Sequence, residues 1–109
     1  MTLGAADTAF VRDLFGDLPD FATRRMFGGM GIYAEGVIFA LMRSDGTLLI
    51  KAQDDDFIDR LTTMGASRWT YTRKSGASAA MPYWTFPEAL LDDPEAALSL
   101  AREALHRLR

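Results

Sequence analysis

The stretch "RRMFGGMGIYAEGVIFAL", Arg24–Leu41, decides how this chain folds. Two arginines precede three glycines in four positions, and the residues that follow are mostly β-branched, aromatic or aliphatic, which is typical of strands. A glycine loop that cradles phosphate runs instead from a strand into a helix. We therefore interpret Gly28, Gly29 and Gly31 as a bend or bulge in a strongly curved strand.

Periodicity on both sides of this stretch predicts the remaining elements. Tight turns are predicted at Glu35-Gly36 and Asp45-Gly46, because glycine reaches the positive φ that such turns need. Apolar residues at helical spacing predict helices over 7–18, over 55–64 and from 94 onward, and two further strands are predicted over 68–74 and 79–86. The expected order is α-β-β-β-α-β-β-α. This order predicts a single α+β domain over 1–109, with a five-stranded antiparallel sheet and helices packed in a second layer, mainly on one face.

Length, charge and cysteine content restrict the class of protein. A chain of 109 residues with 49% hydrophobic residues fits one domain with one core. The net charge of −3 argues against a dedicated nucleic-acid binder, and the lack of cysteine excludes disulfides and thiolate sites. The first residues lack a signal-peptide pattern, and the longest apolar run, Val37–Met42, is too short to span a bilayer. We expect a cytoplasmic protein with no membrane partner.

The apolar run Val37–Met42 places hydrophobic residues on both faces of its strand. Both faces therefore need cover. Either the strand is central and sandwiched, or its outer face is buried against a second copy of the chain. We favour the second alternative and predict a homodimer.

Basic residues concentrate in the predicted strands and turns, whereas the predicted helices are acidic. Neighbouring residues of a strand point to opposite faces, so only one of Arg24 and Arg25 is expected to serve a given site. The residues considered for binding an anion or a partner are Arg24, Arg25, Arg68, Arg73 and Lys74.

Aromatic residues interleave with these cations in the last two predicted strands, at Trp69, Tyr71, Tyr83, Trp84 and Phe86. This mixture is used by platforms for single-stranded nucleic acid, which stack bases on exposed rings. It is also produced by cross-strand packing, which needs no ligand. We favour packing.

Other polar clusters receive structural interpretations. Asp54, Asp55 and Asp56 are expected to cap a helix rather than to hold a cation, because carboxylates satisfy the free N–H groups of a first turn. His106 suits the C-terminal end of a helix, and the segment 75–78 offers serines without an adjacent base. We predict no catalytic residue, no metal ligand and no cofactor.

The segments "RRMFGGMGIYAEGVIFAL", "LLIKA" and "MPYWTFPEALLDDPEAALSLAREAL" resemble the TfoX (Sxy) N-terminal domain family over nearly the whole chain. The resemblance implies a compact α+β domain found in regulators of natural transformation competence. In longer members this domain precedes a second, helical domain, which we expect to be absent here. Besides Arg25, the matching positions are Met26, Phe27, Gly28, Gly29, Gly31 and Tyr33, to which we assign a structural role.

Three functions are consistent with these observations. The first is a non-catalytic regulatory or protein-interaction module with a regulatory protein partner. The second is a nucleic-acid-binding domain that uses the basic aromatic sheet surface. The third is a small-anion-binding domain or enzyme in which an arginine near the glycines holds a carboxylate or phosphate. We favour them in that order.

Overall fold

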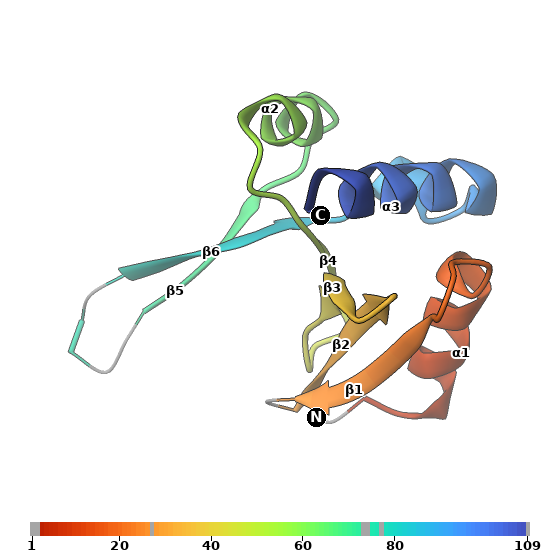
Figure 1. Cartoon of the computed structure of the whole chain (residues 1–109). Helices are drawn as coiled ribbons and strands as arrows, with labels where there is room; N and C mark the ends of the chain where they lie inside the picture. The colour runs from red at the N-terminus through yellow and green to blue at the C-terminus, as the bar shows by residue number, and fades with distance from the viewer. Residues whose placement is uncertain (1–2, 27, 73–74, 77, 109) are drawn as a thin grey trace.

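A computed structural model describes residues 3–26, 28–72, 75–76 and 78–108 of the chain (Figure 1). It confirms an α+β architecture in which one antiparallel sheet is accompanied by three α-helices. The elements in chain order are α1 Ala5–Phe15, β1 Ala22–Met26, β2 Gly29–Ala34, β3 Val37–Met42, β4 Leu48–Lys51, α2 Asp55–Thr63, β5 Arg68–Thr72, β6 Ser78–Thr85, the 3₁₀ helix η1 Glu88–Leu90 and α3 Pro94–Leu108.

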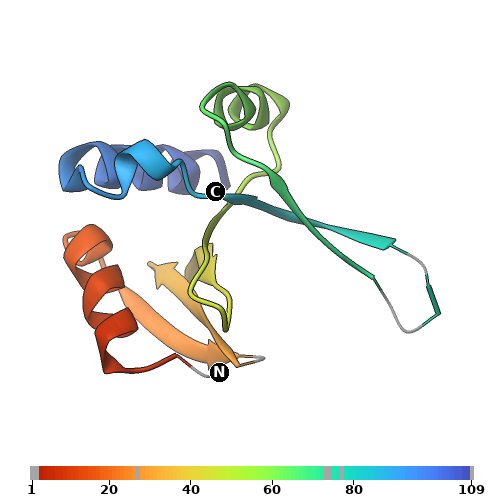
Figure 2. The same cartoon turned by 180° about the vertical axis from the view of Figure 1, so that it is seen from behind.

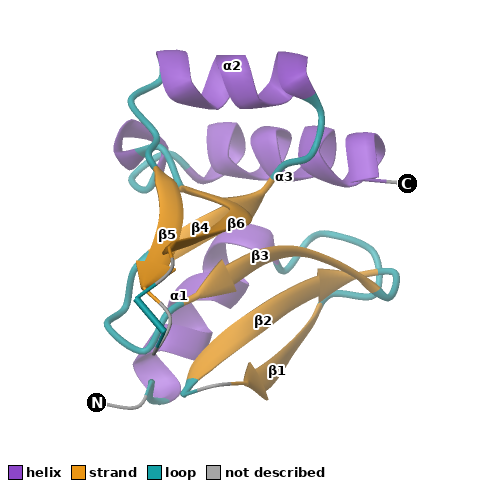
Figure 3. Cartoon of the chain, turned by 90° about the vertical axis from the view of Figure 1, so that its left-hand side faces the viewer, coloured by secondary structure: helices purple, strands orange, loops and turns teal. Residues whose placement is uncertain are grey.

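The sheet has six strands in the order β1-β2-β3-β4-β6-β5, with every neighbouring pair antiparallel. Helices α1 and α3 lie together on one face of β1 to β4, and α2 lies beside α3 (Figures 1 and 2). The hairpin of β5 and β6 projects away from this body as an arm. Viewed along the arm, the strands twist strongly from β1 to β5 (Figure 3).

The prediction of five strands was wrong, because the glycine stretch is a hairpin and not a bulge within one strand. Met26 of β1 pairs with Gly29 of β2, so the chain reverses direction between these two residues. Gly28 has a φ of +77°, which glycine adopts without the strain that a Cβ would cause. Phe27 lies outside the described residues. The predicted curved strand is therefore two paired strands.

The predicted turns and caps are confirmed. Glu35 and Gly36 have φ of 51° and 78° between Ala34 and Val37, as in a type I′ hairpin turn. The Asp54 carboxylate accepts a hydrogen bond from Phe57 N at 3.2 Å, which caps α2, and the Asp93 carboxylate accepts one from Ala96 N at 3.2 Å, which caps α3.

The main core fills the space between the sheet and the helices. It contains Phe15 of α1, Ile32 of β2, Phe39 of β3, Phe57 of α2 and Ala101 of α3, all at most 1% exposed. The ring of Phe15 contacts the ring of Phe39 edge to face, with centroids 5.3 Å apart. None of the helices in the described part of the chain is long and apolar enough to cross a lipid bilayer.

β3 lies in the middle of the sheet, between β2 and β4. The face turned away from the helices carries a smaller apolar cluster, in which Leu41, Leu49 and Tyr83 are 9%, 0% and 7% exposed within a single chain. The run Val37–Met42 is thus central, and much of its outer face is covered by side chains of the same chain. The homodimer remains a prediction that this arrangement does not require.

Candidate functional site

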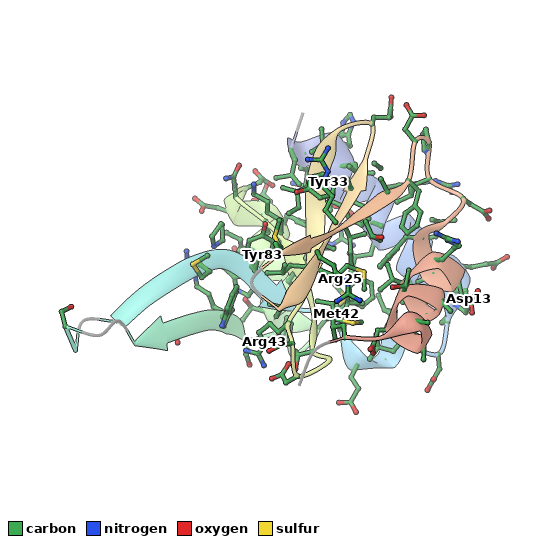
Figure 4. All side chains as sticks on the ribbon, turned by 90° about the horizontal axis from the view of Figure 1, so that it is seen from below. Asp13, Arg25, Tyr33, Met42, Arg43 and Tyr83 are labelled. Carbon is green, nitrogen blue, oxygen red and sulfur yellow. The ribbon has the colours of Figure 1, made fainter. Side chains whose placement is uncertain are left out.

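The candidate site is the sheet face turned away from α1 and α3, which we call the open face. Strand register places on it the side chains of Arg24, Tyr33, Leu41, Lys51 and Tyr83, because directly paired residues of antiparallel strands share a face. Figure 4 shows Arg43 and Tyr83 on the side of the arm, whereas Asp13 lies on α1 across the molecule. The open face thus joins cations, tyrosines and apolar side chains from several strands.

The two N-terminal arginines of the motif occupy different environments, as strand alternation predicted. The Arg24 guanidinium lies 5.5 Å from the centroid of the Tyr33 ring, on the open face. Arg25 instead donates a 3.4 Å hydrogen bond to the Leu3 carbonyl, in front of α1. These two cations therefore do not converge on one ligand.

Arg25 borders a hollow of about 120 Å³ that also contains Thr8 and Thr23. Two hydroxyls and a guanidinium are groups that bind small anions. The hollow is small, and its volume suits an ion of the size of phosphate.

Arg68 lies apart from both of these arginines. Its Nε donates to the Met81 carbonyl at 3.0 Å, and its guanidinium stacks 4.8 Å from the centroid of Trp84. Trp84 belongs to the main core, on the helix side of the sheet. Arg73 and Lys74 lie outside the described residues. The three predicted cations that the structure describes therefore lie in separate places and do not form one patch.

Arg43, which is not among the predicted binding residues, contributes to the open face. Its guanidinium stacks 5.9 Å from the centroid of Trp69 and binds the Asp45 carboxylate at 2.9 Å and the Thr47 hydroxyl at 3.1 Å. The hydrogen bonds from Thr47 hold the pKa of Asp45 below its ordinary value, so the carboxylate that Arg43 binds stays charged to lower pH than a free aspartate. The sequence could have indicated this position, because Arg43 follows Leu41 by two residues and alternate residues of a strand share a face.

Arg43 and Trp69 border a hollow of about 180 Å³ whose floor includes Met26, Leu41 and Ser44. The hollow lies next to the β1–β2 hairpin that carries the motif glycines. A mainly apolar floor beside a fixed guanidinium suits one apolar side chain with an acidic neighbour, which is the chemistry of a peptide.

The motif glycines fill steric roles around this hollow. A Cβ on Gly29 would lie 2.3 Å from the Met42 carbonyl oxygen, and a Cβ on Gly31 would lie 3.0 Å from Met26 Cε and from Tyr33 Cε1. The missing side chains let β2 approach β3 closely and leave room for the Met26 and Tyr33 side chains above Gly31.

Burial changes the pKa of one tyrosine on the open face. Desolvation raises the pKa of Tyr83, and the nearby Tyr33 raises it further. Tyr83 is therefore a neutral hydrogen-bonding group at physiological pH. Among the described residues, Arg24, Arg43, Lys51 and the paired Asp45 contribute formal charge to this face.

The aromatic residues of the last two strands are mostly covered. Tyr83, Trp84 and Phe86 are 7%, 5% and 5% exposed, and the rings of Trp69 and Tyr83 contact each other with centroids 6.4 Å apart. Such rings stabilise the sheet by packing. Stacking of bases requires exposed ring faces, which these three residues do not offer.

A larger hollow of about 650 Å³ lies on another side of the molecule, between α1, the β3–β4 turn and the end of α2. Phe10 and Met64 border it and are 38% and 40% exposed. The motif residues that the structure describes do not line this hollow.

Two comparisons place the chain among known proteins. The family model described as the TfoX N-terminal domain matches residues 13–108. A curated relative, the DNA transformation protein TfoX1 of Aliivibrio fischeri (strain ATCC 700601 / ES114), is 30% identical over 90 residues, which are 82% of this chain and 41% of the relative. The chain thus spans less than half the length of that relative.

Proposed function

The chain belongs to the TfoX N-terminal domain family, and from this premise we propose that it is a non-catalytic regulatory module that binds an acidic protein partner on its open face. The relative of A. fischeri is named a DNA transformation protein. We extend that role to this chain and propose that the complex acts in the control of genes for DNA transformation in the cytoplasm.

The observation that carries the proposal is the pairing of cations with apolar surface on the open face. Arg24 is held against Tyr33 and Arg43 against Trp69, so their guanidinium groups are pre-positioned at little further cost in side-chain entropy. The apolar hollow beside Arg43 supplies the contact area that an ionic interaction alone does not provide.

Charge reversal on the open face tests this proposal. The variant Arg24→Glu/Lys51→Glu should lose a partner that the wild-type chain captures, because like charges across an interface weaken association and slow the encounter. Arg12→Glu, on the exposed side of α1, is the matched control and should retain the partner. Capture that is equal for all three chains, at unchanged melting temperature, would remove the open face from the proposal. Expression of transformation genes in cells carrying the same variants provides the functional readout.

The nucleic-acid alternative has a narrower basis. Arg24, Arg43 and Lys51 are cations on one face, but Tyr83 and Trp84 are buried. Among the aromatic side chains that the structure describes on this face, only Tyr33 and Trp69 are exposed enough to stack on bases. A mobility-shift assay at about 50 mM salt separates the two ideas, because binding to phosphates weakens steeply as salt rises. A salt-sensitive shift that Arg24→Glu/Lys51→Glu abolishes would favour this alternative.

The small-anion alternative rests on the hollow of Arg25, Thr8 and Thr23. If it is correct, phosphate should raise the melting temperature of the wild-type chain and of Arg24→Ala, but not that of Arg25→Ala. The absence of any shift with phosphate, sulfate or simple carboxylates would leave this idea without support.

A further inference from the structure

Strand β5 ends the sheet, because β6 is its one neighbour in the order of the described strands. An edge of this kind presents backbone N–H and C=O groups to another strand. Its sequence, "RWTYT", is rich in aromatic and β-branched residues that favour strands, and contains no proline. By contrast β1, at the opposite end of the sheet, carries Arg24 and Arg25 in its centre, and charged residues of this kind protect an edge from pairing.

The arm also lacks the support that the rest of the sheet has. β5 and β6 extend beyond the body, where none of the described helices covers them (Figures 1 and 2). Thr70 and its partner Ala80 are both exposed. A two-stranded ribbon is only marginally stable in water, and a third and fourth strand make it stable.

The backbone of β5 is regular along the edge that would receive a partner. Arg68 of β5 pairs with Trp84 of β6, and Thr70 pairs with Ala80. Between these two pairs the register is irregular, because β5 has one residue and β6 has three, among them Pro82. The Arg68 side chain donates to the Met81 carbonyl inside this irregularity. The residues inserted at this irregularity thus lie in β6 and not in β5.

We propose that two copies of this chain pair antiparallel through β5, with the two-fold axis at Thr70, to form one continuous sheet. The sequence around Thr70 is symmetric in type, with Trp69 before it and Tyr71 after it. In this register Thr70 lies opposite Thr70, Trp69 lies opposite Tyr71 of the second copy, and Arg68 lies opposite Thr72. Threonines directly opposite each other stabilise a sheet, and no like charges face each other across these pairs.

This inference can be tested separately from the proposed function, because β5 pairing uses the backbone edge of the arm and leaves Arg24, Tyr33 and Lys51 of the open face uncovered. The two proposals share Trp69, which lies on β5 and packs against Arg43. Pairing through β5 also replaces the outer face of β3 as the dimer contact. Leu41 and Leu49 are already covered within one chain, so that face gains little further burial from a second copy.

Charge substitutions at Thr70 test the proposed axis. Sedimentation of the wild-type chain should give twice its 12.1 kDa mass at high concentration. Thr70→Lys and Thr70→Glu should each weaken association by up to about fivefold, because each replaces a threonine pair with two like charges directly opposite one another. An equimolar mixture of the two variants should restore the dimer. Ser99→Lys, at an exposed position of α3, should associate as the wild type does.

Two results would overturn the inference: a single-chain mass at every concentration, or a dimer that Thr70→Lys does not weaken. If the lysine variant does not fold, Thr70→Cys provides a second test, since the chain has no cysteine. Directly opposed residues of antiparallel strands have Cα atoms about 4.5–5.5 Å apart, which lies within the range that a disulfide spans, so mild oxidation should give a disulfide-linked dimer, and Ser99→Cys should not. Equal yields of cross-linked dimer from both cysteine variants would contradict the inference.

Discussion

The glycines of the motif meet two different steric demands, and alanine substitutions separate them. Gly29→Ala should destabilise the chain by about 3 kcal/mol, because the new Cβ would lie 2.3 Å from a backbone oxygen, which cannot move without separating β2 from β3. Gly28→Ala should cost about 1–2 kcal/mol, because its φ of +77° is strained for alanine, although the new Cβ would make only an ordinary contact, 3.5 Å from Ser44 Cβ. Urea unfolding measures both changes.

Gly36→Ala is the matched control for the cost of positive φ. Gly36 has a φ of +78°, and a Cβ added there would meet nothing within 4 Å, so this variant should resemble Gly28→Ala. A cost for Gly29→Ala no greater than that for Gly36→Ala would show that the approach of β2 to β3 is not what excludes a side chain.

Tyr83 should make the chain sensitive to alkali. Burial raises the pKa of this phenol above 10.0, so the unfolded state loses the proton first as pH increases. The stability from the neutral, buried phenol is complete below pH 10.0 and is lost as pH rises through the folded-state pKa. Tyr83→Phe should therefore unfold with a flatter pH dependence between about pH 9 and 11, as measured by urea unfolding. If the free energy of unfolding of the wild-type chain and of Tyr83→Phe depended on alkaline pH in the same way, the prediction would be contradicted.

At the scale of the elements, the sequence was informative wherever one local signal determined the structure. Asp54, Asp93 and Gly65 mark helix ends through their own hydrogen bonds or backbone angles, and these positions are as predicted. The split between β1 and β2 was missed because Gly28-Gly29 can form either a bulge or a hairpin turn. The choice depends on strand pairing, which is a contact between segments and not a property of one segment.

Helices α2 and α3 are joined by ion pairs that should depend on pH. Glu103 contacts Arg60 of α2 and accepts a 3.1 Å hydrogen bond from Arg107 Nε. Burial alone would raise the pKa of Glu103, but the hydrogen bonds and charges of Arg60 and Arg107 outweigh it and lower the pKa below 4.5. This contribution to stability is present above pH 4.5 and is lost as pH falls through the folded-state pKa.

A double-mutant cycle of Arg60→Gln and Glu103→Gln measures this coupling. The coupling free energy should be about 0.5–1 kcal/mol at neutral pH, because both side chains are partly exposed, and should approach zero near pH 3. Urea unfolding at the two pH values provides the numbers. A coupling that is unchanged at the lower pH would mean that the pair acts through packing and not through charge.

At the scale of the whole molecule, the open face shows what sequence patterns leave out. Strand alternation correctly separated Arg24 from Arg25, because that is a local rule. It did not predict that Arg43 of the β3–β4 turn and Trp69 of β5 meet, since β5 is far along the chain and its position follows from the order β4-β6-β5. A site assembled from separate hairpins is therefore only partly readable from the residues of each hairpin.

The division of the molecule into a body and an arm predicts two levels of protection in native-state hydrogen exchange. In dilute solution the amides of 70–72 and 78–80 should exchange through local opening that costs only about 1–2 kcal/mol, because a two-stranded ribbon has little apolar surface to hold it. The amides of β2, β3 and β4 should exchange through opening of the whole domain, because these strands carry the core residues Ile32, Phe39 and Ile50. Raising the protein concentration should slow exchange at 70–72 if two copies pair through β5, and should leave β2 to β4 unaffected. Full protection of the arm in dilute solution would instead mean that the arm is stable without a partner.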